Sequence, residues 1–384
     1  MSQRVAIIGI GATAFRSVTP DLSYRELIYE AAVKGYADAG VEHSEIESFV
    51  SCTEDFTEGT SISDEYCPDQ IGGATKPVHT IAGDGIHGLA SAVMLIRSGL
   101  FDLMAVESHS KISNVDNMEG ILTYAMDPVY QRPIGLSPHA VAALEMRRFL
   151  YESGNRATHC AAVVSKNRAS ALKNPLASNP GKVSPQEVLA SEEVVSPIHA
   201  AEIAPHADGA IIIVLASEKA ARRVKKPVWV HGISWASDTY ALEQRNWAGA
   251  RYAAQAAQKA FQMAGIKNPR SAIDLAEVDD TYAYKELQHL EAVGLTGKGQ
   301  AGRLIERLRE KGPNGLAVNP SGGVIGGGNL GEANGLARVL EIILQLRGEA
   351  GPRQLNKART GLALSWRGVP SSSGAAVVLG VKRP

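Results

Sequence analysis

Side chains that can move protons follow one predicted strand. Asp279 and Asp280 stand at the end of the strand predicted over residues 273–278, and Tyr282 and Tyr284 come next. Because side chains alternate along a strand, the two tyrosines share a side if the strand persists. A buried Asp279 would have a raised pKa and could act as an acid or a base. The pattern indicates acid–base chemistry, with a structural hydrogen-bonding role for Asp279 and core packing for the tyrosines as open alternatives.

A glycine-rich run is the second candidate site. The segment from Gly322 to Gly335 contains seven glycines and leads into a predicted helix. Glycine adopts positive φ and lets backbone amides approach a ligand closely, and a helix N-terminus attracts an anion or a carbonyl oxygen. We expect Gly322, Gly323, Gly327 and Gly328 to bind substrate, together with Tyr282. The alternative is a tight packing turn that binds nothing.

A third candidate lies where a turn enters an amphipathic helix. Asp84 precedes a helix predicted over residues 86–98, and His87 lies in its first turn. Asp84 has the residue type of an N-cap, whose carboxylate accepts a backbone amide; the alternative is a general base. His87 could contact substrate, although a partly buried histidine with satisfied hydrogen bonds is the simpler interpretation.

Three cysteines, Cys52, Cys67 and Cys160, form neither a metal-binding spacing nor a disulfide framework. We therefore predict no metal site and a reducing, cytoplasmic location. Cys52 and Cys67 fall in a loop-rich stretch and not at a helix start beside the glycine run, so neither is expected to act as a nucleophile.

Composition excludes several classes of protein. The 384 residues are 45% apolar and 21% charged, with a formal net charge of −1, so neither nucleic acid nor an anionic membrane is an expected partner. The longest apolar run, residues 210–216, is far shorter than the ~20 residues of a membrane span. A strand predicted close to the N-terminus gives no sign of a signal or transit peptide.

Strand and helix signals alternate along the chain, which predicts an α/β fold. Residues 5–8 have the pattern of a buried strand, Ser23 to Glu26 form a capping box that opens a helix, and Gly40 ends that helix. Residues 9–14 fit the dinucleotide-binding pattern G-x-G-x-x-A, which requires a helix to begin there. Because the helix begins only near residue 23, we reject a dinucleotide site.

A weak internal repeat points to a duplicated domain. Residues 31–41 resemble residues 256–266, and each copy is followed by a short loop and a strand. A looser pair of helices begins with Gly-Leu-Ala at residues 88 and 335. Two such pairs in the same order favour duplication over the chance similarity of alanine-rich helices.

The repeat predicts an N-terminal half over residues 1–225 and a C-terminal half over residues 226–384. Residues from about 115 to 200 fit neither half, being rich in Pro, Asn and Ser with a helical piece at 140–151. A long insertion of this kind often covers a binding cleft; a subunit contact is the alternative.

Four segments together resemble the thiolase superfamily, most closely its sterol-carrier-type and archaeal branch. They are the turn and helix at 82–99, the stretch from Pro197 through Asp208-Gly209-Ala210 and the strand after it, Glu277-Val278-Asp279-Asp280-Thr281-Tyr282, and Asn319-Pro320-Ser321-Gly322-Gly323, which is the most specific. The resemblance covers essentially the whole chain. It implies a thiolase fold, in which two βαβαβαββ halves form five layers and a loop domain is inserted in the first half.

The resemblance also implies where a thiolase active site would lie. Thiolases use a cysteine at a helix N-terminus, where the helix dipole stabilises the thiolate, and Ala82 stands in that position. The histidine of the family's Gly-His-Pro motif matches Asn329, and an oxyanion-hole residue matches Asp279, whose charge opposes a developing anion. The second cysteine falls close to Ser365-Trp366. None of the four elements is intact, so ordinary thiolytic acyl transfer is not expected.

One related group uses a different chemistry. In thiolase-like aldolases of steroid side-chain breakdown, tyrosines replace the cysteines and catalyse a retro-aldol cleavage. One of those tyrosines matches Tyr284, and the other matches Asn329, so only half of the pair is present. We expect an enzyme that makes or breaks a C–C bond in an acyl-CoA, with Tyr284, Asp279 or Asp84 moving the proton and the glycine run holding the thioester. Coenzyme A enters as the substrate thioester, and no covalently bound cofactor is expected.

Two other functions stay open. The resemblance allows a catalytically inactive subunit that forms a homodimer, or a heterodimer with an active thiolase, or that holds a small zinc-ribbon/OB-fold protein binding acyl-CoA. Conventional acetyl-CoA acyltransfer would require a cysteine elsewhere to reach the site.

Overall fold

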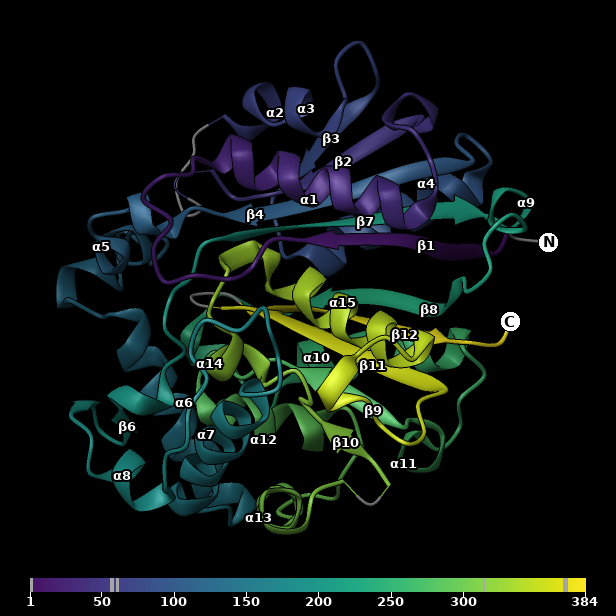
Figure 1. Ribbon diagram of the computed structural model, residues 1–384. Coiled ribbons are helices and arrows are strands. Elements are labelled where there is room, and N and C mark those ends of the chain that lie inside the picture. The colour runs from purple at the N-terminus through teal and green to yellow at the C-terminus, as the bar shows by residue number, and fades with distance from the viewer. Residues whose placement is uncertain (1–2, 56–58, 60–61, 314, 369–371) are drawn as a thin grey trace.

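The computed structural model describes residues 3–55, 59, 62–313, 315–368 and 372–384 (Figure 1). Its main sheet has ten strands: β1 (Val5–Ala12), β2 (Ser48–Cys52), β3 (Val78–Ile81), β4 (Leu103–Ser110), β7 (Gly209–Ser217), β8 (Val228–Ser237), β9 (Leu275–Val278), β10 (Ala317–Val318), β11 (Thr360–Arg367) and β12 (Ser373–Gly380). A small separate pair consists of β5 (Glu193–Val195) and β6 (Ile198–His199). Within these described ranges, no helix is long and apolar enough to cross a membrane.

Helices alternate with the strands, which confirms the predicted α/β class. The longer ones are α1 (Tyr24–Ala39), α4 (Gly85–Ser98), α6 (Pro138–Ser153), α7 (Ala157–Ala171), α10 (Arg251–Met263), α12 (Ala283–Ala292), α13 (Ala301–Lys311) and α15 (Asn334–Arg347). Short ones are α2 (Ser63–Tyr66), α3 (Pro68–Ile71), α5 (Met118–Tyr124), α8 (Pro185–Leu189), α9 (Glu218–Ala221), α11 (Pro269–Ala272) and α14 (Gly323–Gly327). The 3₁₀ turns are η1 (His43–Glu45), η2 (Ile112–Asn114), η3 (Arg132–Ile134), η4 (Ala200–Glu202), η5 (Leu242–Gln244), η6 (Gly331–Ala333) and η7 (Gly351–Arg353). The predicted capping box at Ser23 does open α1, and Gly40 ends it in a left-handed conformation.

The strand order repeats itself across the sheet. Read from the outer edges, the first half runs β3-β2-β4-β7-β1 and the second runs β10-β9-β11-β12-β8. In both halves the three outer strands are parallel and the remaining pairings are antiparallel. The halves join where β1 pairs with β8, with Ala6 opposite Trp229 and Ile7 opposite Val228. This order is the one expected of two βαβαβαββ units placed side by side.

Three apolar cores separate the layers. On one face of the first half, α1 packs through Leu27 and Ile28. Between the halves, α4 and α15 share a core to which Leu89 and Leu336 contribute. On the outer face of the second half, α10 and α12 build a third core around residues such as Leu287. Figure 1 shows α1 in the upper part and α12 in the lower part, with β1, β7, β8 and β12 between them.

The glycines of β1 are there because α1 lies against the strand. A Cβ at Gly9 or Gly11 would collide with backbone atoms of α1 at Gly35 and Ala31. β1 continues past both glycines, and α1 starts well after the strand ends. Close packing therefore explains the glycines that imitate a dinucleotide-binding pattern, and no helix opens at them.

The inserted segment folds over the second half of the chain. Its helix α7 packs against α12, α13 and α14, and α6 bonds to α12 through Glu145, which accepts from Lys285 at 2.7 Å (Figure 1). Asn167 of α7 donates to Asp280 at 2.7 Å, and Lys166 donates to the carbonyl of Val318 at 3.0 Å. The insertion therefore reaches the carboxyl ends of β9 and β10, a position that fits a cover over a site at these strand ends.

The strand does not persist as far as the two tyrosines. β9 ends before Tyr282, and α12 begins between Tyr282 and Tyr284. The extended run stops because Asp279 turns back to accept the amide of Thr281 at 2.9 Å. The condition for the tyrosines to share one side of a strand is therefore not met. The rings are nevertheless neighbours, with centroids 6.1 Å apart, because the turn and the first residues of α12 bring them together.

A buried ion pair joins the start of the insertion to the N-terminal region. Asp208 is fully buried and accepts from Lys111 Nζ at 2.9 Å and from Thr19 Oγ1 at 2.7 Å. Asp208→Ala leaves Lys111 buried without a counter-charge, so we expect the free energy of unfolding measured in urea to fall by about 3–5 kcal/mol. Glu30→Ala, which removes an exposed pair with Lys34, should cost less than about 1 kcal/mol. Equal losses in the two variants would contradict this account.

Candidate functional site

One arginine joins the start of α4 to the end of β9. The Nη2 atom of Arg338, on α15, donates to Asp279, and its Nη1 atom lies 4.0 Å from Oδ2 of Asp84. All three side chains are buried. The structure thus brings two of the predicted site residues together across a guanidinium. The sequence analysis did not identify Arg338. The only sign of it in the sequence is a basic residue inside the apolar run of α15.

Asp84 is the N-cap of α4. Its Oδ1 atom accepts the amide of Ile86 at 2.9 Å. Burial raises the pKa of Asp84 above its ordinary value, while the charge of Arg338 and a hydrogen bond from Ser365 oppose that shift. Gly335 must be a glycine, since a Cβ there would collide with this carboxylate. The carboxylate therefore occupies the positive ends of both α4 and α15, where an anion or a substrate oxygen would otherwise be stabilised.

Asp279 and Asp280 face opposite sides of the chain. Asp279 points towards α15 and forms an ion pair with Arg338. Asp280 points towards the glycine run, where its Oδ1 atom accepts the amide of Val324 at 2.6 Å. Burial, and then the charge of Glu286, raise the pKa of Asp280 to about 7. Both carboxylates thus have structural partners, which favours the hydrogen-bonding interpretation of Asp279 over its use as a free base.

The glycine run is mostly a packed turn. Asp280 binds the first two free amides of α14, so these groups are not available to a ligand. A Cβ on Gly322, Gly323 or Gly328 would collide with neighbouring atoms, whereas Gly327 has open space at its α-carbon. The adjoining cavity of about 30 Å³ is too small for an acyl chain. Packing accounts for three of the four candidate glycines, and Gly327 is the one that a ligand could approach.

Tyr282 is bonded to a histidine that carried no signal in the sequence. Its hydroxyl lies 2.9 Å from Nδ1 of His139, which sits in the first turn of α6, and the rings meet edge to face. The ring of Trp366 is a further neighbour, with its centroid 6.1 Å from that of Tyr282. The hydrogen bond therefore joins the inserted segment to the turn after β9.

Tyr284 lies deeper than Tyr282. It is 1% exposed, and its hydroxyl has no hydrogen-bond partner in the described part of the chain. Burial, and then the charge of Glu145, raise the pKa of Tyr284 well above its ordinary value. Lys285 lies 5.3 Å from the Tyr284 ring and donates to Glu145 at 2.7 Å, and burial lowers the pKa of Lys285 to about 8. Tyr284 thus keeps its proton and is able to donate a hydrogen bond.

Asn329 lies beside the segment that holds Tyr282. Its amide donates to the carbonyl of Pro205 at 2.7 Å, and Ile203, two residues earlier, forms a bridge with Tyr282. Its side-chain oxygen accepts from Asn334 Nδ2 at 2.7 Å, which fixes the turn before α15. Asn329, which matches one aldolase tyrosine, and Tyr282, two residues before the match to the other, are thus tied to the same short segment, residues 203–207.

His87 has an unsatisfied ring. Its Nδ1 atom is buried and has no hydrogen-bond partner among the residues the structure describes. Burial lowers the pKa of His87, which favours its neutral form. The expectation of a histidine with satisfied hydrogen bonds is therefore wrong, and His87 stays a candidate for contact with substrate.

A thiol is lacking at the start of α4, where Ala82 is exposed two residues before the N-cap. Cys52 was expected away from any helix start, but its Sγ atom lies 3.9 Å from the carbonyl of Gly85, in the first turn of α4. Cys52 is fully buried, and burial raises the pKa of its thiol well above the ordinary value. A buried neutral thiol is not a nucleophile.

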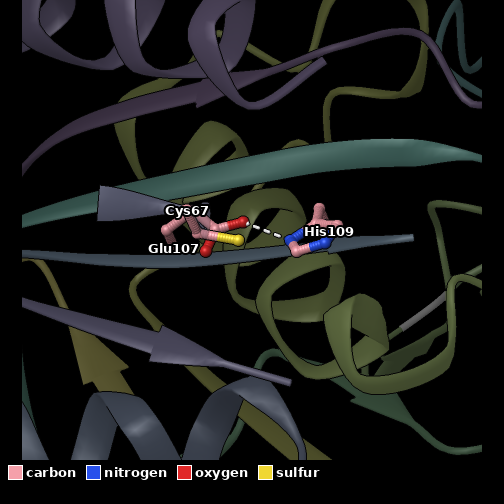
Figure 2. A group of neighbouring side chains, drawn as sticks. All are labelled: Cys67, Glu107 and His109. Atoms are coloured by element: carbon pink, nitrogen blue, oxygen red, sulfur yellow. Dashed lines mark hydrogen bonds and ion pairs between the residues drawn. The ribbon is translucent and has the colours of Figure 1, made fainter. Parts of the chain in front are cut away.

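Cys67 belongs to a separate cluster. Figure 2 shows it beside Glu107 and His109, whose Oε1 and Nδ1 atoms are 2.8 Å apart. Ligand atoms of the three lie within 4.8 Å of one another, but Glu107 already accepts from Ser51 at 2.7 Å as well as contacting His109. Cys67 packs in the core under α1, and α4 covers the opposite face of the sheet. The sheet therefore separates this cysteine from Ala82.

Comparison with known proteins identifies the family. Residues 234–380 match the family described as Thiolase C-terminal domain-like. The acetyl-CoA acetyltransferase of Methanothermobacter thermautotrophicus is 31% identical over 367 residues, which cover 93% of this chain and 94% of that protein. Sterol carrier protein 2 of Bos taurus is 28% identical over 94% of this chain and 70% of its own length. The chain belongs to the thiolase superfamily, in its sterol-carrier-type and archaeal branch.

A solved structure supports the same assignment of fold. The structure described as Ltp2-ChsH2(DUF35) aldolase has a TM-score of 0.83 and 23% identity, and the match covers 99% of this chain and 98% of that chain. The predicted thiolase fold is confirmed. At this identity the likeness establishes the fold and not the activity.

Removal of Arg338 tests whether it holds the two aspartates together. Arg338→Met leaves Asp84 and Asp279 buried without a counter-charge, so the free energy of unfolding in urea at pH 7 should fall by about 3–5 kcal/mol. Arg147→Met removes an exposed arginine of α6 and should change it by no more than about 0.5 kcal/mol. A loss in the Arg338 variant as small as in the control would show that the bridge is unimportant.

The pH dependence of stability reports on Glu202, which precedes residues 203–207. Burial raises the pKa of Glu202 from 4.5 to about 7. The folded protein therefore holds a proton that the unfolded chain releases, so the stabilisation is complete below about pH 4 and is lost as the pH rises through 7. Glu202→Gln stays neutral at every pH. It should match the wild type at pH 4 and exceed its free energy of unfolding by about 3 kcal/mol at pH 8; a difference that does not change with pH would count against the buried carboxyl.

Proposed function

We propose that this protein makes or breaks a C–C bond in an acyl-CoA thioester by proton transfer, without a covalent acyl-enzyme. Retro-aldol cleavage of a β-hydroxyacyl-CoA is the favoured reaction. The observation that carries the proposal is the state of the α4 start: Ala82 stands in the nucleophile position, and the thiol beside it, Cys52, is buried with a raised pKa. Attack by sulfur, as in conventional acetyl-CoA acyltransfer, has no group here to perform it.

Relatives support the substrate class and the reaction type. The archaeal relative is named an acetyl-CoA acetyltransferase, which favours a coenzyme A thioester as substrate and no other cofactor. The similar solved structure is named an aldolase, which favours C–C cleavage on this fold. Both names describe those proteins, and their transfer to this chain is part of the proposal.

The geometry distributes the proposed roles among the candidate residues. Tyr284, whose raised pKa keeps its hydroxyl protonated, is suited to donate a hydrogen bond to the substrate. Asp84 and Asp279 are suited to fixing Arg338 in place rather than accepting a substrate proton. His87, with its unsatisfied nitrogen, is available for contact with the substrate. These assignments are consistent with a site that works through fixed hydrogen bonds.

Gly327 of the glycine run and Asn329 in the turn after it complete the proposed site. Gly327 has space for the close approach of a thioester. Asn329 orients the turn that leads into α15 through its bond to Asn334. Neither residue supplies acid or base, so both are proposed to hold the substrate in position.

A second candidate function is that of an inactive subunit. The Asp84 carboxylate fills the positive ends of α4 and α15, which is a structural reason for weak binding of a developing anion. β3 forms one outer edge of the sheet and pairs only with β2 among the described strands, so a second subunit could add to it. The partner would be a second copy, an active thiolase, or a zinc-ribbon/OB-fold protein that binds acyl-CoA. The two-part name of the Ltp2-ChsH2(DUF35) aldolase supports partnering of this fold with a second protein. A cytoplasmic location remains part of this proposal.

Incubation with a panel of β-hydroxyacyl-CoA thioesters tests the proposed activity. We expect release of an aldehyde or ketone together with a shortened acyl-CoA, both followed by liquid chromatography. Cys52→Ala should keep the wild-type rate because the thiol takes no part. Absence of any carbonyl product across a broad panel, together with co-purification with a co-expressed thiolase, would replace this function by the inactive-subunit role.

A further inference from the structure

We propose that Tyr282 and His139 form the proton-transfer pair of this site. In this pair, Tyr282 takes the proton of the substrate's β-hydroxyl as it passes its own proton to His139. The inference rests on the proposed function and names two groups that would perform it. His139 comes from the inserted segment, so the insertion would contribute to the chemistry as well as covering the strand ends.

Geometry is the first reason. The Tyr282 hydroxyl and His139 Nδ1 are 2.9 Å apart, which is hydrogen-bond distance for direct proton transfer. The interplanar angle of the two rings is 80°, with centroids 5.8 Å apart. A tyrosine with a hydrogen-bonded base is the arrangement that lets a weak acid act as a proton relay.

Both side chains are held in place. Tyr282 is 6% exposed, and its ring lies against Tyr284 and Trp366 at 6.1 Å between centroids in each case. Its backbone is fixed by the bridge to Ile203. His139 follows Pro138 at the start of α6, where Ser137 caps the helix by accepting the amide of Ala140 at 3.2 Å. Packing therefore holds both side chains in the rotamers that bring the Tyr282 hydroxyl and the His139 ring together.

The electrostatic surroundings favour a neutral imidazole before reaction. The positive end of the α6 dipole lies at His139 and disfavours a second positive charge there. His206 is close enough for the two histidines to influence each other: partial burial, and then the charge of His139, lower the pKa of His206. Lys285 adds positive charge behind the ring of Trp366, 4.3 Å from its centroid, and Tyr284 is a further titratable neighbour.

A route to solvent is present on the same side. His206 is exposed at the surface, and His139 is half-buried. The chain at His206 forms a bridge with Asn329, which places this histidine beside the turn before α15. Because His139 is only half-buried, the pair can exchange protons with water, which a fully buried group would not allow.

The other candidate groups lack an adjacent proton acceptor. Tyr284 has no hydrogen-bond partner within the described chain, so its hydroxyl has no group to which it can pass a proton. Asp84 and Asp279 are held by Arg338, and Asp280 is held by the amides of the glycine run. Tyr282 is the candidate that is bonded to a neutral base.

The proton and electron balance of the step is complete. As Tyr282 accepts the β-hydroxyl proton and delivers its own to His139, the Cβ oxygen becomes a carbonyl and the Cα–Cβ bond breaks. The electron pair of that bond passes to the thioester as an enolate. The proton then returns from His139 through Tyr282 to Cα, which yields the shortened acyl-CoA and restores both residues. No oxidant, reductant or metal enters the step.

Variants of both residues test the pair. They are made in the full-length protein and assayed with a β-hydroxyacyl-CoA that the wild type converts. His139→Gln and Tyr282→Phe should each lower kcat by about 100-fold or more, with smaller effects on KM. The wild-type rate should fall at acid pH as His139 becomes protonated, and His139→Gln should lose that acid limb. Added imidazole should restore part of the rate of His139→Ala, which also shows that the variant is folded. His231→Gln, a histidine bonded to the carbonyl of Lys382 at 2.7 Å, is the control and should keep the wild-type rate.

The outcomes separate this inference from the function on which it rests. A wild type that is inert on the whole panel overturns both. If the wild type is active and its His139→Gln and Tyr282→Phe variants keep both the rate and the acid limb, only the proposed pair is overturned. Loss of the rate with an unchanged pH profile and no rescue by imidazole assigns His139 a merely structural role and likewise overturns it.

Discussion

The contact between Arg338 and two aspartates is the interaction on which the rest of the site depends. Asp84 and Asp279 come from different halves of the chain, and both are buried where α4, α15 and the end of β9 meet. Each carboxylate alone would be costly to bury, because an ion loses its hydration in an apolar core. One guanidinium offsets both charges, so a carboxylate can stand at the ends of two helices where the fold would otherwise attract an anion. A fixed negative charge therefore occupies the positive ends of α4 and α15.

This arrangement supports the proposal that the protein works without sulfur chemistry, and it indicates which groups would remain. A cysteine at Ala82 would draw on the α4 dipole to form a thiolate, but the Asp84 carboxylate already uses that dipole. Cys52 lies close by and is kept neutral by burial. What remains is a set of hydrogen-bonded groups on the other side of β11, where the turn after β9 meets the insertion. A reaction at this place would have to proceed through proton transfer and positioning, and both depend on groups whose rotamers are already locked.

Much of the fold could be predicted from the sequence, because it is specified locally. The capping box at Ser23 and the glycine at Gly40 set the ends of α1, and the alternation of strands and helices gave the class. The site was harder to predict, because its contacts are long-range. Arg338 pairs with Asp279 across 59 positions, and His139 bonds to Tyr282 across 143, so no local pattern marks either. The glycine run shows the opposite error: it has the composition of a ligand loop, yet most of its glycines are required by packing against neighbouring residues.

Intact-protein mass spectrometry during turnover is the most direct test of the central claim. The chain would be sampled from milliseconds to minutes after mixing with a β-hydroxyacyl-CoA and, separately, with acetyl-CoA. The account predicts the unmodified mass at every time point while a carbonyl product accumulates. An acyl adduct that forms and decays at the rate of turnover would contradict it, because such an adduct requires a nucleophile that these buried thiols do not supply.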